Sequence, residues 1–174
     1  MRKLKRFFGC ALLSSMLMSQ IVYANTPTWE QLSKTHRASV LLPASVTQNQ
    51  DIQMGDARGI RLATCILRIY NGEDGTIKIS VDTAAHKNID VIYQTVFLDE
   101  WDDEREDWVQ VGYWEFEKHK EEENGELSSY HVDLTVSGCQ VNHYYRARAM
   151  HLVQWGDDME GKATETDGVL LTNK

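Results

Sequence analysis

Apolar and polar side chains alternate along most of the chain from residue 60 onward. In residues 76–84, Ile77, Ile79 and Val81 fall on one side of the chain and polar residues on the other. A period of two is typical of a half-buried β-strand, and turn-forming clusters recur roughly every 8 to 15 residues. The pattern predicts strands at residues 61–70, 76–84, 90–98, 108–117, 127–136, 141–155 and 164–172.

About seven strands with short loops and no helical periodicity predict an all-β fold, an antiparallel β-sandwich of immunoglobulin or fibronectin-like architecture. Residues 137–145 then correspond to the corner before the sixth strand, with Tyr144 or Tyr145 as a corner tyrosine. Such an architecture does not by itself imply a function.

The first 59 residues have a different character. Residues 1–24 combine a basic start, an apolar run and the small-residue pattern of Val22 and Ala24, which predicts a secretory signal peptide cleaved after Ala24. Residues 25–59 are polar and interrupted by Pro27 and Pro43, which predicts a flexible leader with a short helix at 28–33. The expected division is a signal peptide at 1–24, a leader at 25–59 and a β-sandwich domain at 60–174, in a protein that is secreted.

Charge narrows the range of partners. The chain has 18 Lys and Arg against 26 Asp and Glu, for a net charge of −8, and loss of four basic residues with the signal peptide makes it −12. Phosphate backbones and anionic lipid head groups repel so acidic a protein. An extracellular protein or a glycan is therefore the expected partner, with no nucleic acid, no integral membrane segment in the mature chain and no cofactor.

Two cysteines, Cys65 and Cys139, lie outside the signal peptide. In an oxidising compartment they predict one disulfide. Closure of that loop of roughly 75 residues would stabilise the fold by about 4–5 kcal/mol in the chain-entropy model. Two unpaired, buried thiols are the alternative.

Three acidic clusters occur, at residues 99–107, 121–126 and 157–160. The second and third fall at the same end of the predicted sandwich, and carboxylate oxygens are the ligands that calcium prefers. Weak calcium candidates are Glu123, Glu126, Asp157 and Asp158. However, no cluster has the spacing of an EF-hand loop, and acidic loops are commonly just solvated, so no metal is assigned.

Aromatic residues provide a second candidate site in residues 108–117. Strict alternation places on one face Trp108, Gln110, Gly112, Trp114 and Phe116. An aromatic strip with amides beside it is typical of carbohydrate-binding sandwiches, whereas a tryptophan stripe of period two also fits a hydrophobic core. The tryptophans considered as ligand-binding residues are Trp108, Trp114 and Trp155.

The sequence contains no established catalytic motif. It has no His-Glu-x-x-His or Cys-x-x-Cys motif and no Gly-x-Ser-x-Gly nucleophile elbow. His131 and His151 fall in predicted strands and are interpreted as structural groups. A secreted hydrolase would need two carboxylates at a defined separation, and the candidates for them are Glu115, Glu117 and Asp133. No residue is assigned as catalytic.

Several short motifs occur in a recognisable order. They lie at residues 70–77, 89–92, 108–111 with Trp114, 144–151 and 166–170. This order resembles a family of small secreted domains of unknown function from Gram-positive bacteria, the DUF6147 family, over about residues 60–173. The resemblance implies export and a compact β domain, and it brings no catalytic residues. It also implies as family-wide features Trp114, Tyr145, Arg146, Arg148 and His151.

Arg146 and Arg148 are two residues apart on one predicted strand, so their guanidinium groups point to the same side. They either pair with carboxylates of a neighbouring strand or bind a ligand. The sequence favours a secreted, non-catalytic binding or interaction module of undetermined ligand at or outside the bacterial cell surface. A carbohydrate-binding module and a secreted carboxylate-dependent hydrolase are the alternatives.

Overall fold

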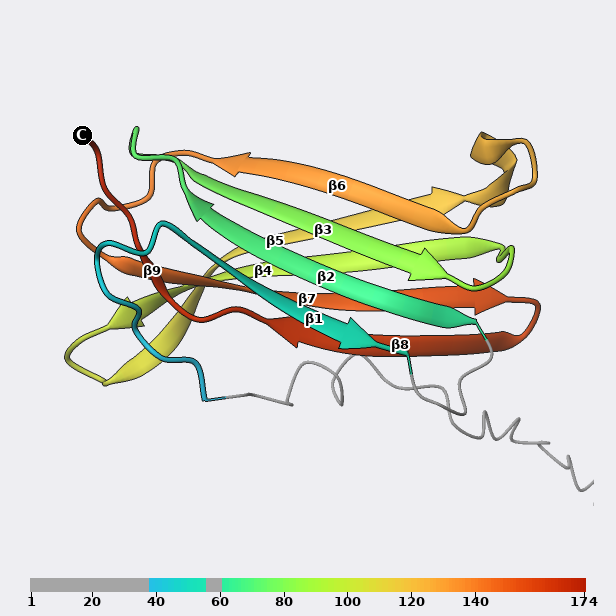
Figure 1. The fold of residues 1–174 in the computed structure, drawn as a ribbon, viewed down its shortest axis with the longest axis horizontal. Helices are drawn as coiled ribbons and strands as arrows, with labels where there is room; N and C mark the ends of the chain where they lie inside the picture. The colour runs from blue at the N-terminus through green and yellow to red at the C-terminus, as the bar shows by residue number, and fades with distance from the viewer. Residues whose placement is uncertain (1–37, 56–60) are drawn as a thin grey trace, which may run out of the picture.

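The computed structural model describes residues 38–55 and 61–174, and in this part of the chain two antiparallel sheets pack face to face (Figure 1). The first sheet has the strand order β1-β2-β3-β6, and the second has the order β5-β4-β7-β8 with β9 beside β7. The predicted all-β sandwich is therefore confirmed. A short 3-10 turn, η1, joins β5 to β6.

The elements are β1 (Gln48–Met54), β2 (Leu62–Asn71), β3 (Ile77–Ala85), β4 (Val91–Asp102), β5 (Asp107–His119), η1 (Lys120–Glu123), β6 (Ser129–Val136), β7 (Tyr144–Trp155), β8 (Asp158–Glu165) and β9 (Val169–Leu170). Paired strands follow one another closely in the sequence, as in β2–β3, β4–β5 and β7–β8.

β1 lies within the stretch for which the sequence predicts a flexible leader. It pairs with β2 along its whole length, and the carboxylate of Asp51 accepts a hydrogen bond from the backbone amide of Glu165 at 2.9 Å. Pattern analysis misses it because an edge strand rich in amides, with Ile52 and Met54 exposed, lacks apolar alternation. Residues 38–55 thus belong to the sandwich, whereas the predicted signal peptide lies outside the described residues.

The last predicted strand, 164–172, is also placed differently. β8 follows β7 directly through a tight turn, with Trp155 opposite Asp158, and only Val169 and Leu170 form β9. Sequence analysis predicts a loop for the acidic residues 157–160. Asp158 and Glu160 instead belong to an edge strand, where charged side chains discourage pairing with other chains.

Two hydrophobic clusters fill the space between the sheets. The larger one contains Leu67, Ile79, Val96 and Tyr145. The smaller one lies toward the start of β2 and contains Leu62, Cys65, Ile92 and Val153.

Tyr145 is the corner tyrosine that the sequence predicts. Its ring is almost fully buried in the larger cluster. Its hydroxyl accepts a hydrogen bond from the Gln140 backbone N–H at 2.9 Å and donates one to the Gln140 carbonyl oxygen at 3.2 Å. These bonds fix the loop before β7 against the sandwich, as in immunoglobulin-like corners.

The predicted Cys65–Cys139 disulfide is wrong, because both cysteines are free. Cys65 pairs with Thr83 on β3, whereas Cys139 follows the end of β6, where Val136 pairs with Ile77. Thr83 and Ile77 are six residues apart, or about 20 Å along the strand. A disulfide requires Cα atoms within about 7 Å, so the two thiols lie too far apart to bond.

A polar network lies between the sheets around His151, which is fully buried. Its Nδ1 and Nε2 atoms are 2.7 Å from Thr83 Oγ1 and 2.9 Å from Thr164 Oγ1. Gln94 Nε2 donates to Thr83 Oγ1 at 2.9 Å. Burial lowers the pKa of His151 to about 3, so the imidazole is neutral at neutral pH. The prediction that His151 is a structural group is confirmed.

Candidate functional site

An extra residue in β5 shapes the most distinctive region of the surface. Gly112 pairs with Leu98, but Gln110 pairs with Asp99, so Val111 has no partner on β4 and forms a β-bulge. The bulge places Gln110 beside Arg148 on the outer side of the second sheet. Trp114 packs inward against the core.

The prediction that residues 108–116 present one aromatic face is therefore wrong. Trp108 lies opposite Trp101 and under the guanidinium of Arg146, whereas Trp114 and Phe116 pack against the larger core cluster. Since alternation has a period of two, one inserted residue exchanges the faces of everything on one side of it. The sequence pattern gives no indication of such an insertion.

A buried charge cluster next to Trp108 and Gln110 consists of Asp99, Arg146, Arg148 and Glu165. Asp99 accepts hydrogen bonds from Arg146 Nε at 2.9 Å and from Arg148 Nε and Nη2 at 2.7 and 2.9 Å. Arg146 Nη1 donates to Glu165 Oε1 at 2.8 Å. The side chains of Asp99 and Arg146 are only 2% and 6% exposed. The predicted pairing of both arginines with carboxylates is confirmed.

The three tryptophans considered as ligand-binding residues already make intramolecular contacts. The Arg146 guanidinium lies 4.7 Å from the centre of the Trp108 ring, and Trp101 packs edge-on against it at 5.3 Å. Trp155 packs against the smaller core cluster and lies 5.4 Å from the guanidinium of Arg61. Together with the inward position of Trp114, these contacts give the tryptophans a structural role.

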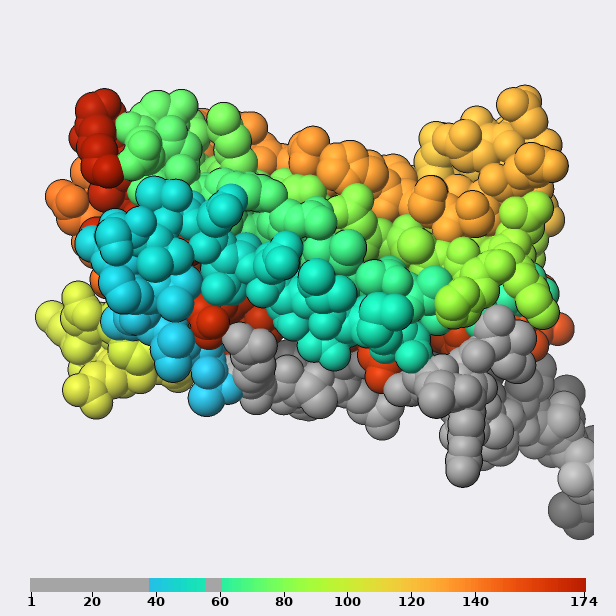
Figure 2. Space-filling model, viewed as in Figure 1, coloured from blue at the N-terminus to red at the C-terminus, as the bar shows by residue number. Residues whose placement is uncertain are grey.

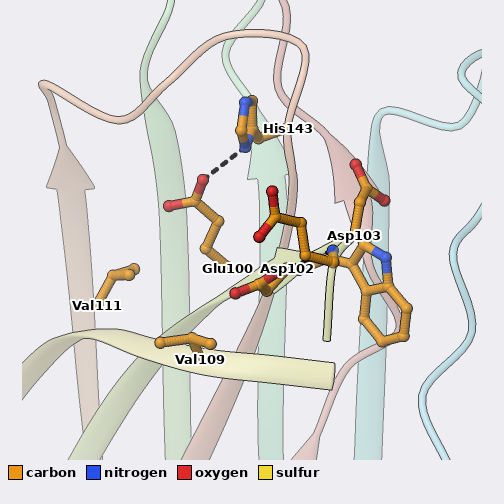
Figure 3. A pocket seen from close by; sticks show the side chains of 8 residues that line it. Glu100, Asp102, Asp103, Val109, Val111 and His143 are labelled. Carbon is orange, nitrogen blue, oxygen red and sulfur yellow. Dashed lines mark hydrogen bonds and ion pairs between the residues drawn. The ribbon is translucent and has the colours of Figure 1, made fainter. Parts of the chain in front are cut away.

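A cavity of about 390 Å³ opens at the turn of the β4–β5 hairpin (Figure 3). We call it the acidic pocket. It is lined by Glu100, Trp101, Asp102, Asp103, Glu104, Val109, Val111 and His143. The hairpin that carries it projects from one end of the sandwich (Figure 1).

The polar side of the acidic pocket is strongly negative. Four of its residues carry carboxylates, and Glu100 Oε1 lies 2.6 Å from His143 Nδ1, as drawn in Figure 3. Asp102 is held by the backbone N–H groups of Glu104 and Arg105, at 2.9 and 3.1 Å. Arg105 also pairs with Asp102 at 3.3 Å, but its side chain is 71% exposed. The cavity therefore attracts a cation.

The other side of the acidic pocket is apolar. Val109 and Val111 lie there on the neighbouring strand (Figure 3). Val111, the bulge residue, is 50% exposed. A pocket with one charged side and one apolar side suits a cation carried on an aliphatic chain.

Sequence analysis identified only part of this pocket. The acidic run 99–107 stood out; it contains Trp101 and ends just before Trp108. His143 was not predicted as a site residue because it is 43 positions from Glu100 and comes close only through the pairing of β4 with β7. Val111 was not predicted because its exposure depends on the bulge.

The candidate hydrolase carboxylates do not converge. Glu115 and Glu117 lie on the exposed side of β5 in the second sheet, whereas Asp133 lies on the exposed side of β6 in the first. These are opposite outer faces of the sandwich. Glu115 accepts a hydrogen bond from the Tyr113 hydroxyl, and Asp133 lies 3.0 Å from His131 Nε2.

The calcium candidates lie at one end of the sandwich, as the sequence predicts. Asp90 connects the acidic clusters 121–126 and 157–160. Its carboxylate accepts hydrogen bonds from Lys120 Nζ and from the backbone amide of Gly156, both at 2.6 Å. Glu123 pairs with Lys118 at 3.0 Å. Lysines thus neutralise Glu123 and Asp90. No three His, Cys, Asp or Glu side chains within residues 38–55 and 61–174 are arranged to share a metal ion. The other candidates, Glu126, Asp157 and Asp158, are exposed.

In the described part of the chain, no helix is both long enough and apolar enough to cross a membrane. No protein-family model matches the sequence, and no curated protein is similar to it. The resemblance to the DUF6147 family therefore stays a prediction.

Proposed function

We propose that this protein is a secreted, non-catalytic binding module whose acidic pocket receives a lysine or arginine side chain of an extracellular protein partner. The observation that carries the proposal is the composition of the pocket. Four carboxylates lie beside two valines in one cavity of about 390 Å³. The predicted signal peptide supports the location.

A long cationic side chain matches both sides of the pocket. Its methylene groups would lie against Val109 and Val111, and its charged end would lie among Glu100, Asp102 and Asp103. A neutral apolar ligand would instead remove water from several carboxylates without compensation.

The charge of the whole protein favours the same partner. With a net charge of −8 over the full sequence, the chain attracts basic surfaces at a distance and accelerates their association at low salt. Salt screens this attraction over about 8–10 Å at physiological ionic strength. Binding is therefore expected to weaken as salt is added.

The pocket is supported by a rigid framework, which lowers the entropic cost of binding. The buried pairing of Asp99 with Arg146 holds β4 against β7 directly beneath the hairpin. The bonds of the Tyr145 hydroxyl fix the loop that leads to His143.

The earlier alternatives have less support from the geometry. A carbohydrate site on the aromatic face would need Trp108 and Trp114 to be open, whereas Trp108 contacts Arg146 and Trp114 packs against the core. A hydrolase would need Asp133 close to Glu115 or Glu117, whereas they lie on opposite faces.

The test is calorimetric titration with tetralysine at low salt, with side-chain-acetylated tetralysine as the uncharged control. We expect only the charged peptide to bind. Glu100→Gln and Asp103→Asn should each weaken binding by roughly three- to tenfold, which is about 0.7–1.4 kcal/mol. Glu121→Gln, an exposed carboxylate on η1, is the matched control.

Two results would contradict the proposal. Equal binding of the acetylated peptide would show that charge is not recognised. An equal loss of affinity in Glu121→Gln would show that only the overall negative charge matters, and not the acidic pocket.

A further inference from the structure

The outer face of the first sheet presents regular rows of side chains, because β1, β2, β3 and β6 are in continuous register there. One row contains Gln48, Tyr70, Lys78 and Thr135. The next contains Gln50, Arg68, Ser80 and Asp133. The alternate residues, such as Leu67, Ile69 and Ile79, fill the core. This face is turned toward the viewer in Figure 2.

A second cavity, of about 480 Å³, lies on this face over β1 and β2. We call it the β1–β2 pocket. It is lined by Gln48, Asn49, Gln50, Arg68 and Tyr70. The lining contains amides, one aromatic ring and one guanidinium, and it contains no carboxylate. In a chain of net charge −8, that composition distinguishes this pocket from the acidic pocket.

Arg68 is oriented but retains hydrogen-bonding capacity. Its Nη1 donates to Asp82 Oδ2 at 2.7 Å, and its side chain is 29% exposed. Among the described residues, its other two nitrogens, Nε and Nη2, have no hydrogen-bond partner. A guanidinium fixed at one corner presents its remaining N–H groups in a fork that fits a carboxylate.

The nearby acidic groups are already engaged. Asp82 pairs with both Arg68 and His131, the latter at 2.7 Å, and Asp133 lies 3.0 Å from the other imidazole nitrogen. Exposed Lys78 adds positive charge in the row of Tyr70. Arg68 and Lys78 thus offset the charges of Asp82 and Asp133 around the pocket.

We propose that the β1–β2 pocket binds an acidic saccharide. Arg68 would bind the sugar carboxylate, the ring of Tyr70 would stack on a sugar face, and the amides of Gln48 and Gln50 would bond its hydroxyl groups. Amides suit hydroxyls because each offers both donors and an acceptor. Tyrosine combines an apolar ring face with a polar end.

Other ligand classes fit this pocket less well. A cation would meet Arg68 and Lys78 with no carboxylate in the lining. An apolar ligand would bury amides and a guanidinium without partners, which is unfavourable. The site is independent of the acidic pocket, and it uses none of the tryptophans that the sequence suggested for sugar binding.

The experiment is a titration of ¹⁵N-labelled protein followed by NMR. The probe is tetragalacturonate, and the matched control is its methyl ester, which has the same rings and hydroxyls without the charge. We expect tetragalacturonate to shift the amide resonances of Gln48, Gln50, Arg68 and Tyr70, and the ester to bind at least tenfold more weakly. Sulfate is titrated separately.

Single-residue variants test the role of each side chain in the β1–β2 pocket. Arg68→Gln should weaken tetragalacturonate binding about tenfold and leave ester binding unchanged. The Arg68–Asp82 pair is partly exposed, so its loss should cost little stability. Tyr70→Leu should weaken both ligands. Arg105→Gln, which removes an exposed arginine on the distant β4–β5 hairpin, should change neither.

Several outcomes would overturn the proposal. They are an absence of shifts at millimolar tetragalacturonate, shifts centred elsewhere, wild-type affinity in Arg68→Gln, or an equal loss in Arg105→Gln. Equal shifts with sulfate would show a simple anion site and reject the saccharide. Should Arg68→Gln fail to fold, Tyr70→Leu decides, because retained tetragalacturonate binding in that variant would also reject the proposal.

Discussion

The acidic pocket and the β1–β2 pocket each place a surface cavity near an Arg–Asp pair, but the two pairs differ in burial. At the acidic pocket, the Asp99 and Arg146 side chains are 2% and 6% exposed and are therefore closed to a ligand. At the β1–β2 pocket, Arg68 and Asp82 are 29% and 33% exposed, and part of the guanidinium remains available. In our proposal, the same two residue types hold the fold where they are buried, and at Arg68 they offer a recognition group where they are partly exposed.

The largest expected effect separates these two pairs. Asp99→Asn leaves Arg146 and Arg148 buried without a full countercharge, so it should lower the free energy of unfolding by about 3–5 kcal/mol. Asp82→Asn should cost only about 0–1 kcal/mol, because solvent screens that pair. Urea unfolding of both variants measures the difference, and equal losses would remove the distinction between the two regions.

Acid should destabilise the fold through His151. The unfolded chain binds a proton near pH 6.5, whereas the folded chain does so only near the lowered pKa of about 3. Stability is therefore intact above pH 6.5 and falls below it, by about 1.4 kcal/mol per pH unit down to about pH 3.

Unfolding free energies measured between pH 7 and 4 test this slope. His151→Gln should flatten it. The exposed His131 provides the contrast, because its hydrogen bonds to the carboxylates of Asp133 and Asp82 raise its pKa. Its contribution to stability is lost as pH rises, so His131→Gln should not flatten the acid slope. A slope unchanged by His151→Gln would reject this explanation.

A smaller loss of stability is expected at the corner before β7, where the Tyr145 hydroxyl bonds Gln140. Tyr145→Phe removes the two hydrogen bonds to Gln140 while keeping the buried ring, so it should cost about 1–2 kcal/mol. Thermal unfolding measures the loss. Tyr113→Phe, which changes a half-exposed tyrosine on β5, is the control and should have little effect; equal losses in the two variants would show that the corner bonds are unimportant.

The smallest effect concerns Arg105, the exposed cation beside Asp102. Arg105→Gln makes the acidic pocket more negative, so tetralysine affinity should rise by about twofold, which is about 0.4 kcal/mol. Calorimetry at low salt measures it. Weaker tetralysine binding in this variant would indicate that Arg105 contacts the peptide instead of competing with it.

Sequence analysis predicted the sandwich because most strands bury one face and so alternate clearly. It missed β1, whose outward side chains Gln48 and Gln50 are amides, and it misplaced β8, whose residues Asp158 and Glu160 resemble a loop. Both are edge strands, where burial constrains the sequence least. The β1–β2 pocket depends on β1 and could not be predicted without it.

Local sequence also carries little information about distances across the fold. The pairing of Arg146 and Arg148 with carboxylates followed from alternation on one strand. The disulfide prediction failed because the separation of Cys65 and Cys139 depends on strand register, which their positions in the sequence do not specify. The bulge at Val111 likewise became apparent only from the pairing of β4 with β5.

The most direct test of two pockets with opposite preferences is NMR mapping of tetralysine and tetragalacturonate on one labelled sample. The account predicts that tetralysine shifts the amides of Glu100, Asp103 and Val111, that tetragalacturonate shifts those of Gln50, Arg68 and Tyr70, and that neither displaces the other. Overlapping sets of shifted residues, or tetralysine shifts spread evenly over every acidic loop, would contradict it.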